Sequence, residues 1–196
     1  VRSSAASDVY KRQIIGNSEP RYLYTISLNA DWNGFFLSAL FDGVGRQQWF
    51  PSDESLFWGM YNRPYNQVPT WHLQNYWTEE RPNAYLPRYV GYYGPMNANT
   101  VNVNTRYLQD VSYIRLKNLT VDYTFPAHIC RKMRIKGLKV YVSGENLWTS
   151  SPMFKYCDNY DPEVINAGDS DFRTAEGDGY SYPMLRTVTL GLNLTF

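Results

Sequence analysis

The last eleven residues of the chain alternate strictly between apolar and polar positions after Arg186. One parity carries Val188, Leu190, Leu192, Leu194 and Phe196, and the other carries Thr187, Thr189, Gly191, Asn193 and Thr195. Alternation with a period of two predicts a β-strand whose two faces meet different environments. Chain ends are usually frayed and polar, so a pattern that continues to the last residue indicates that this end has a role of its own.

Four earlier segments also read as strands. They span residues 21–30, 34–42, 111–125 and 138–149. In residues 111–125 the alternation is clean only in the second half of the segment. We expect all five strands to place their aliphatic parity on one sheet face, convex and exterior, because a slip of one residue would invert every side chain. The polar parities should share the opposite, concave face.

The segments that connect these strands are alternately short and long. The turn near residues 31–34 and the connector 126–136 are short, whereas residues 43–110 and 150–184 are long and irregular. In an outer-membrane barrel, short turns lie at the periplasmic end and long loops at the extracellular end. The sequence therefore predicts an all-β fold, an antiparallel transmembrane β-barrel of which about five strands with long extracellular loops are present.

Aromatic residues near the strand ends fit the girdles that such barrels carry at the two membrane interfaces. The candidates are Tyr22, Tyr24, Tyr123, Phe125, Trp148 and Phe196. The last strand must pair with another, because no open sheet edge is tolerated in lipid. We interpret Phe196 as an assembly signal read by the barrel-assembly machinery; the alternative is that it merely ends a strand of a sandwich.

Composition restricts the class only in part. A net charge of +1 gives no electrostatic reason to expect nucleic acid as a partner. The mean hydropathy of −0.49 argues against a helical membrane protein, but a barrel also has low mean hydropathy because only alternate residues face lipid. A soluble or surface β-sandwich that binds glycans is the alternative. A continuous apolar parity over five strands favours the membrane.

Several segments resemble one family in the same order along the chain. The clearest are DVSYIRLKNLTVDYTFP (110–126), LKVYVSGENLW (138–148), YDPEV (160–164) and YPMLRTVTLGLNLTF (182–196). They resemble the C-terminal part of SusC/RagA proteins, which are TonB-dependent transporters of the outer membrane. The resemblance implies a plugged barrel of about 22 strands. It also implies import of oligosaccharides or peptides through the TonB system, with a SusD-like lipoprotein as the lid and the lipid bilayer as surroundings.

The resemblance covers roughly residues 20–196 and includes neither a plug domain nor a TonB-contacting segment. We therefore interpret residues 14–196 as a C-terminal part of the barrel. Residues 1–13, VRSSAASDVYKRQ, are rich in Ser and Ala without alternation, and we interpret them as a non-native leader or a translated read end. A native extracellular loop is the alternative for these residues.

Catalytic and metal-binding patterns are weak, so we expect no enzyme, no metal and no cofactor. His72 and His128 are far apart in sequence, without metal-ligand spacing. One loop is acidic and is interpreted as solvated, with calcium binding next and glycoside hydrolysis last. Its carboxylates are Asp158, Asp161, Glu163, Asp169, Asp171, Glu176 and Asp178. The basic connector of Arg131, Lys132, Arg134 and Lys136 is interpreted as a solvated turn.

The long connector 43–110 is rich in aromatic residues, including Trp49, Trp58, Trp71 and Trp77. Aromatic faces bury a large area at a small entropic cost and can stack on sugar rings. The connector could pack its own aromatic side chains, dock the lid protein or contact the ligand directly. All three interpretations are open at this point, and the four tryptophans are the candidate contact residues.

The two cysteines lie on connectors of opposite kind. Cys130 falls in a short turn and Cys157 in a long loop. In a barrel these ends are separated by an apolar band about 25 Å tall, whereas the Cα atoms of a disulfide lie within about 7 Å. We therefore predict that the two cysteines form no disulfide.

Overall fold

The structure is a computed structural model that describes residues 14–51, 55, 57–59, 68–89, 103–165 and 182–196. The predicted leader, residues 1–13, lies outside the described residues. Five long strands form one antiparallel sheet in the order β1-β2-β5-β6-β7. They are β1 (Tyr22–Trp32), β2 (Phe35–Gly45), β5 (Tyr113–Thr124), β6 (Gly137–Ser150) and β7 (Thr187–Thr195). The five predicted strands and their antiparallel pairing are confirmed.

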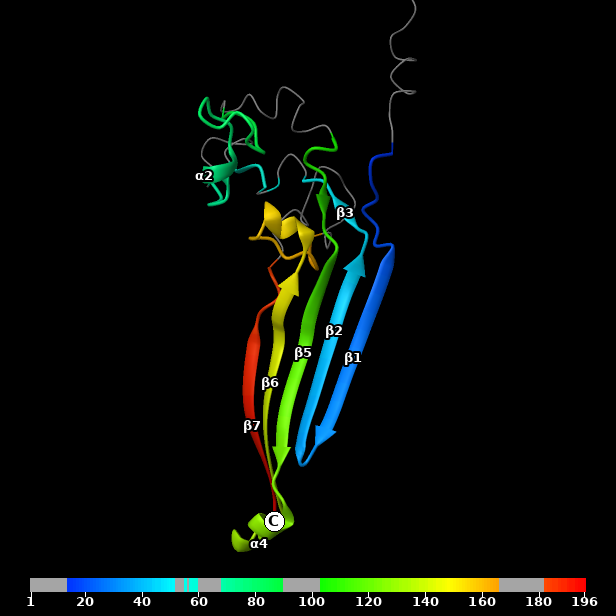
Figure 1. Cartoon of the computed structure of the whole chain (residues 1–196), viewed down its shortest axis with the longest axis vertical. Coiled ribbons are helices and arrows are strands. Elements are labelled where there is room, and N and C mark those ends of the chain that lie inside the picture. Colours follow the sequence, from blue (N-terminus) through cyan, green and yellow to red (C-terminus); the bar gives the residue numbers. More distant parts are fainter. Residues whose placement is uncertain (1–13, 52–54, 56, 60–67, 90–102, 166–181) are drawn as a thin grey trace, which may run out of the picture.

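Short and long connectors lie at opposite ends of this sheet (Figure 1). The β1–β2 turn and the β5–β6 connector are at one end, and the connectors β2–β5 and β6–β7 are at the other. The described parts of the two long connectors pack together, and we call them the loop unit: residues 46–51, 55, 57–59, 68–89, 103–112 and 151–165. The loop unit contains β3 (Gln48–Trp49), α2 (His72–Asn75), β4 (Gln109–Asp110) and the 3-10 helix η2 (Pro152–Lys155).

The register places the predicted aliphatic parities on one face of the sheet. Leu190 pairs with Val142, which pairs with Val121, which pairs with Leu37. Directly paired residues of antiparallel strands point to the same side. The face they share, which we call the apolar face, carries at least fourteen exposed large hydrophobic side chains: Tyr22, Tyr24, Ile26, Leu28, Trp32, Phe35, Leu37, Val121, Val142, Trp148, Val188, Leu190, Leu192 and Leu194.

An irregularity in β5 explains why its alternation is clean in only one half. Leu40 pairs with Asn118, but Phe41 pairs with Leu116, so Lys117 is an extra residue opposite β2. A bulge of this kind shifts the parity of one strand by one residue. The shift turns Leu116 onto the apolar face together with Phe41, although Leu119 and Leu116 have opposite parities.

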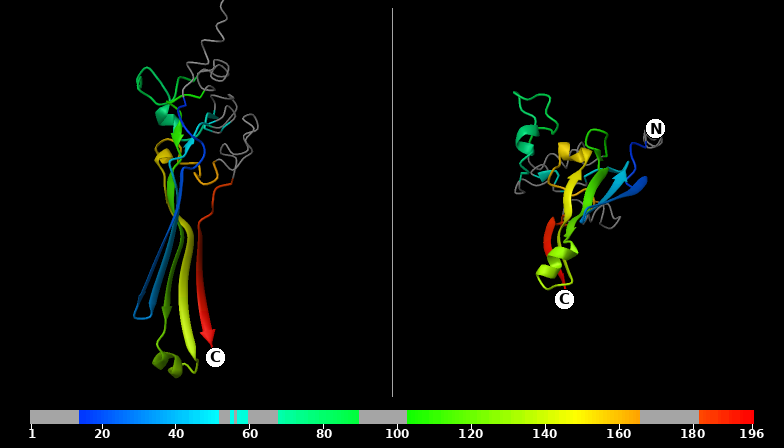
Figure 2. Two further views of the ribbon diagram at one scale, coloured as in Figure 1. Left: turned by 90° about the vertical axis from the view of Figure 1, so that its right-hand side faces the viewer. Right: turned by 60° about the horizontal axis from the view of Figure 1, so that its bottom comes forward.

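Polar side chains occupy the other face, which we call the polar face. Ser143 pairs with Thr120 and Thr189, and Asp122 pairs with Tyr141. Tyr141 also covers Gly191 of β7, where a Cβ atom would overlap its ring. Among the described residues, no second sheet covers the apolar face, since the β3–β4 pair belongs to the loop unit (Figure 2). The β-sandwich alternative therefore gains no support from the described chain.

The short β5–β6 connector contains a helix that the alternation did not predict. Helix α4 (Ala127–Lys132) begins directly after Pro126, whose φ of −66° suits a helix start. Its one buried side chain is Cys130. No helix in the described part of the chain is long and apolar enough to span a membrane.

Candidate functional site

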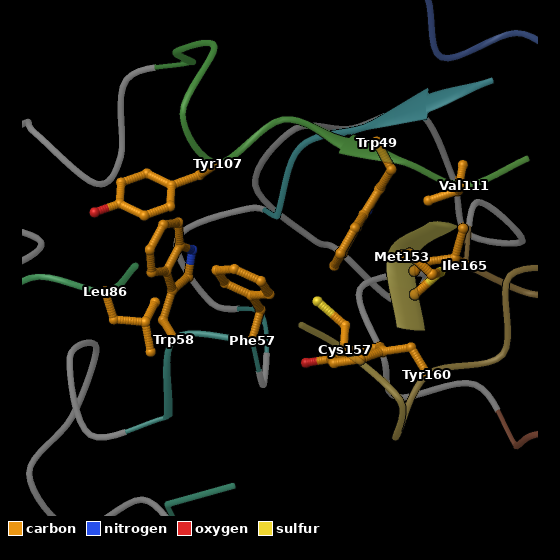
Figure 3. Packing of buried hydrophobic residues seen from close by; sticks show 10 residues of the cluster. All are labelled: Trp49, Phe57, Trp58, Leu86, Tyr107, Val111, Met153, Cys157, Tyr160 and Ile165. Atoms are coloured by element: carbon orange, nitrogen blue, oxygen red, sulfur yellow. The ribbon is translucent and has the colours of Figure 1, made fainter. Parts of the chain in front are cut away.

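The loop unit has a core of its own, separate from the two faces of the sheet. Ten buried residues form it: Trp49, Phe57, Trp58, Leu86, Tyr107, Val111, Met153, Cys157, Tyr160 and Ile165. Figure 3 shows Phe57 in the middle of this core, with Trp58, Leu86 and Tyr107 on one side and Trp49, Met153, Cys157 and Tyr160 on the other. The core thus joins the two long connectors, which are far apart in sequence.

The strands of the sheet position this core. β3 follows β2 and β4 precedes β5, and the two short strands pair Gln48 with Asp110 and Trp49 with Gln109. This places the Trp49 ring 5.6 Å from the Tyr160 ring and 6.2 Å from the Phe57 ring, measured between centroids. Offset and edge-on ring pairs at such distances are favourable beyond the area they bury.

The four candidate tryptophans divide into two groups. Trp49 is 4% exposed and Trp58 is 2% exposed, and Trp58 Nε1 donates a hydrogen bond to the Pro51 carbonyl at 3.3 Å. Trp71 packs against the core and Trp77 is half-buried. Packing accounts for Trp49 and Trp58 without a ligand, so any contact with a ligand or lid protein is better assigned to Trp71 and Trp77; for all four it stays a prediction.

His72 of helix α2 is a fully buried part of this structure and is not exposed to a ligand. Its Nε2 lies 2.8 Å from the Phe57 carbonyl and therefore donates, while Nδ1 accepts from the Tyr89 hydroxyl at 2.7 Å. Burial lowers the pKa of His72 to about 4, although the hydrogen bond to Phe57 opposes this shift. His72 is therefore neutral at pH 7. It connects the segment around Phe57 to the segment around Tyr89.

Tyr85 joins the two connectors through stacking and hydrogen bonds. Its ring stacks on that of Tyr156 with a centroid distance of 3.8 Å, and its hydroxyl accepts from Gln109 Nε2 at 2.7 Å. Burial raises the pKa of Tyr85 to about 12. Arg106 donates to the Tyr85 carbonyl, so this residue is fixed at both its ring and its backbone.

The two cysteines are free, as the strand topology predicts, and both are buried. Cys157 lies in the loop unit and Cys130 in helix α4, at opposite ends of the sheet (Figure 1). Burial raises the pKa of the Cys157 thiol. A buried thiol of raised pKa is a poor nucleophile, so Cys157 contributes packing.

A charged cluster that no sequence motif predicts fastens the acidic loop to the sheet. Arg115 of β5 is 3% exposed and donates to Asp161 and, at 2.7 Å, to Glu163. Its Nε donates to Thr149 Oγ1 of β6 at 2.9 Å, and Lys117 Nζ also contacts Glu163. The charges of the two cations and the two carboxylates balance, as burial requires.

Asp161 also holds together both ends of the segment that follows it. Its carboxylate accepts from the backbone N–H of Met184 at 2.9 Å and of Glu163 at 3.0 Å. Burial alone would raise its pKa, but these bonds and that from Arg115 outweigh burial and keep the pKa of Asp161 below its usual value. We call the cluster of Arg115, Asp161 and Glu163 with the Met184 amide the loop latch.

Of the remaining candidate residues, those that the structure describes do not come together into a reactive centre. Asp158 and His128 are exposed, and Asp169, Asp171, Glu176 and Asp178 lie outside the described residues. Among the residues that the structure describes, no group of three or more His, Cys, Asp or Glu side chains is placed to hold a metal ion. Phe196 is exposed at the end of β7, and its role as an assembly signal stays a prediction.

Comparison with known proteins identifies relatives of one kind. No model of a protein family matches the chain. TonB-dependent receptor P3 of Formosa agariphila is 29% identical over 189 residues, 94% of this chain, and TonB-dependent receptor P26 of the same organism is 36% identical over 125 residues, 61% of this chain. The chain spans only 17% and 12% of the length of these two relatives.

Solved structures show the same fold. The RagAB peptide importer in its closed-closed state matches with a TM-score of 0.60 at 22% identity, over 94% of this chain and 18% of that chain. A second RagAB peptide transporter structure matches with a TM-score of 0.60 at 23% identity, over 93% of this chain and 18% of that chain. The predicted resemblance to TonB-dependent receptors is confirmed by these relatives, and it agrees with the predicted outer-membrane location. The RagAB structures confirm the antiparallel barrel-type fold.

Proposed function

We propose that the chain is a C-terminal part of the barrel of an outer-membrane importer that takes up oligosaccharides or peptides with energy supplied through TonB. One observation carries this proposal: five antiparallel strands present a continuous, uncovered apolar face. The similarity to TonB-dependent receptors supports it, and those relatives are named as receptors and not as enzymes.

The energetics of the apolar face favour lipid over water. Leu190 is 76% exposed and Val188 is 71% exposed, with exposed Leu192 beside them. Moving one such side chain out of water gains roughly 1.5–3 kcal/mol when burial is complete. Contiguous apolar patches of this kind are rare on soluble monomers, whereas the outer wall of a membrane barrel is an apolar band.

The polar face and the sheet edges fit the same proposal. Buried Asp122 pairs with Lys139 at 2.9 Å on the polar face, where a barrel interior would lie. Within the described chain, β1 and β7 each pair with one strand only. Because unpaired backbone groups are costly in lipid, both edges must meet further strands, which a longer protein of this family would supply.

The loop unit is the proposed contact region for the partner and the ligand. Its core leaves Trp71, just before helix α2, and Trp77, after it, partly exposed, with exposed Leu73 of the helix between them. Aromatic side chains are enriched where proteins recognise partners. We assign this surface to a SusD-like lipoprotein lid, while TonB would act on a part of the protein outside this chain and the barrel-assembly machinery on the β7 end.

A pair of charge substitutions tests whether the apolar face meets lipid. Leu190→Arg places a cation on the apolar face of β7, and Thr189→Arg places the same cation on the polar face next to it. In lipid the first costs up to about 2–4 kcal/mol near the bilayer midplane, so the folded, heat-modifiable species in outer-membrane fractions should fall well below that of Thr189→Arg. Equal yields from the two variants would show that the face meets water and would contradict the proposal.

Uptake measurements test the transport step and the substrate class. Cells that express the full-length protein containing this chain should accumulate either fluorescent oligopeptides or labelled oligosaccharides, and deletion of TonB should abolish the accumulation. Uptake that does not depend on TonB would contradict the proposed energy source.

Trp77→Ala in the same protein tests the contact surface: a loss of lipoprotein co-purification with normal outer-membrane levels supports the assignment.

A further inference from the structure

A cluster of unpaired cations lies on the short connector between β5 and β6. The 22 residues from 123 to 144 contain no Asp or Glu. Four cations of the connector are exposed: Arg131, Lys132, Arg134 and Lys136. Lys139, the next cation along the chain, pairs with Asp122, whereas none of these four has an ion pair among the described residues.

The backbone of this connector is fixed and does not depend on the cations. Cys130 is buried and its Sγ lies 3.7 Å from the Phe125 carbonyl. The amide of Ile135 donates to the Cys130 carbonyl at 3.1 Å, and the amide of Lys136 donates to the Thr195 carbonyl of β7 at 2.8 Å. The charged side chains therefore extend from an ordered support and are not needed to hold it together.

The connector begins where a row of aromatic side chains ends. Phe35 and Tyr123 lie 4.4 Å apart between ring centroids, and Tyr123 and Phe125 lie 4.9 Å apart. Trp32 and Phe196 are exposed at the same end of the sheet, and helix α4 lies beyond the strand ends beside the C-terminus (Figure 1). In membrane barrels such an aromatic row lies at headgroup depth, which places the four cations level with lipid phosphates.

We propose that this basic turn, residues 131–136, binds the phosphate groups of anionic phospholipids in the leaflet that it meets. The inference rests on the proposed function, because it needs the sheet to stand in a bilayer. Clusters of four or more Lys and Arg next to a membrane attract anionic headgroups, and guanidinium groups donate paired hydrogen bonds to phosphate oxygens. Exposed Met133 lies between the cations and can contact the acyl boundary.

A membrane lipid fits this surface better than an acidic protein does. The cations continue directly from the aromatic row that borders the apolar face, so lipid already lies beside them. The described residues at this end of the sheet include two acidic residues, Asp122 and Asp31. Asp122 is paired with Lys139, and Asp31 lies near the β1–β2 turn. An acidic protein partner would have to displace lipid from the adjoining aromatic side chains.

The test compares lipid binding by two variants of the full-length protein that have lost the same charge. The first carries Arg131→Gln, Lys132→Gln, Arg134→Asn and Lys136→Gln; Asn is chosen at residue 134 because its φ of 59° is tolerated by Asn. The matched control replaces four exposed cations at the opposite end by Gln: Arg21, Arg88, Lys155 and Arg186. Binding of phosphatidylglycerol and of phosphatidylcholine to the detergent-solubilised proteins is counted by native mass spectrometry.

We expect the basic-turn variant to lose at least tenfold in phosphatidylglycerol affinity, with unchanged phosphatidylcholine binding, while the control keeps most of its affinity. Equal losses in both variants would reduce the effect to net charge and overturn the proposal, as would displacement of the lipid by equimolar inorganic phosphate. Unchanged lipid binding would also overturn it and leave an acidic protein as the occupant. Heat-modifiable mobility of each variant reports the barrel separately, so its loss would count against the proposed function and not against lipid binding alone.

Discussion

Replacing Asp161 by Asn tests whether the loop latch holds the second long connector to the sheet. The substitution keeps the size of the side chain but only one of the two carboxylate oxygens, of which Oδ1 accepts from the Glu163 amide and Oδ2 accepts from the Met184 amide. It removes the negative charge next to Arg115, whose side chain is almost fully buried. The change therefore removes the ionic contact together with one of the two backbone hydrogen bonds of the latch.

The expected cost follows from what remains around Arg115. Breaking a buried ion pair by removing one partner costs about 3–5 kcal/mol when the other charge is left alone. Here Glu163 still contacts Arg115 at 2.7 Å and is less buried than Asp161, so the cost should be lower, about 2–3 kcal/mol. A local opening free energy reduced by this amount increases the exchange rate of the protected amides roughly 30- to 150-fold.

Hydrogen exchange of the full-length protein measures this effect at defined places. Peptides that contain the amides of Glu163 and Met184 should exchange faster in Asp161→Asn, while peptides from the centre of β6 should not change. Asp158→Asn is the matched control, because Asp158 is an exposed carboxylate of the same loop. Exchange rates within threefold of the wild type at Met184, or equal increases in the two variants, would show that the Asp161 charge does not hold the connector to the sheet.

The latch should also depend on pH in one direction. Hydrogen bonds hold the pKa of Asp161 below its usual value, so the unfolded chain binds a proton more readily than the folded one. The stabilisation is therefore complete above the unfolded pKa of about 3.9 and is lost as the pH falls through the lower folded pKa. Protection of the Met184 amide should decrease in acid in the wild type and change little in Asp161→Asn.

Three further outcomes are expected. Gly191→Ala should destabilise the sheet by about 1–3 kcal/mol in urea unfolding, because a Cβ would overlap the Tyr141 ring, whereas Gly137→Ala, whose nearest neighbour lies 3.6 Å away, should be tolerated. The thermal stability of the loop unit, followed by near-ultraviolet circular dichroism, should decrease as the pH falls from 6.5 toward 4. The reason is that the pKa of buried His72 is lowered to about 4, so the unfolded state takes up the proton first. His72→Gln should remove this pH dependence. Phe196→Ala should reduce the heat-modifiable protein in the outer membrane more than the stability of the protein that does assemble, and wild-type levels would contradict an assembly role.

The five strands could be predicted because their residue types follow from a local feature, the alternation of the two strand faces. A strand with one apolar and one polar environment must alternate apolar and polar residues, so the sequence alone indicates that Leu190 and Thr189 lie on opposite faces. The alternation also excluded registers shifted by one residue, because Val142 and Val121 can share a face with Leu190 in only one parity. The bulge at Lys117 appeared in the sequence only as a loss of alternation in the first half of residues 111–125, because a single inserted residue changes parity without adding a motif.

The packing of the loop unit could not be predicted in this way, because its contacts join residues that are far apart in sequence. Its tryptophans were recognised as a group, but their burial depends on a second connector that supplies Met153 and Cys157 more than 90 residues after Trp58. Composition gave the same signal for buried Trp58 and for half-buried Trp77. Charge patterns were equally uninformative: Asp161 and Asp158 stand three residues apart, and only the sheet position of Arg115 makes one of them a structural anchor.

The core of the loop unit and the apolar face of the sheet are adapted to different surroundings, water and lipid, and that difference explains their different sequence patterns. The loop unit must bury its aromatic rings against one another in water, so Trp58 and Phe57 follow no period and are nearly fully enclosed. The sheet needs no such partner if lipid covers it, so its aliphatic residues follow the strand period and remain exposed. A sandwich would require both surfaces to be enclosed. The coexistence of an enclosed core and an exposed face that alternates apart from one bulge is what a membrane barrel with a folded loop region requires.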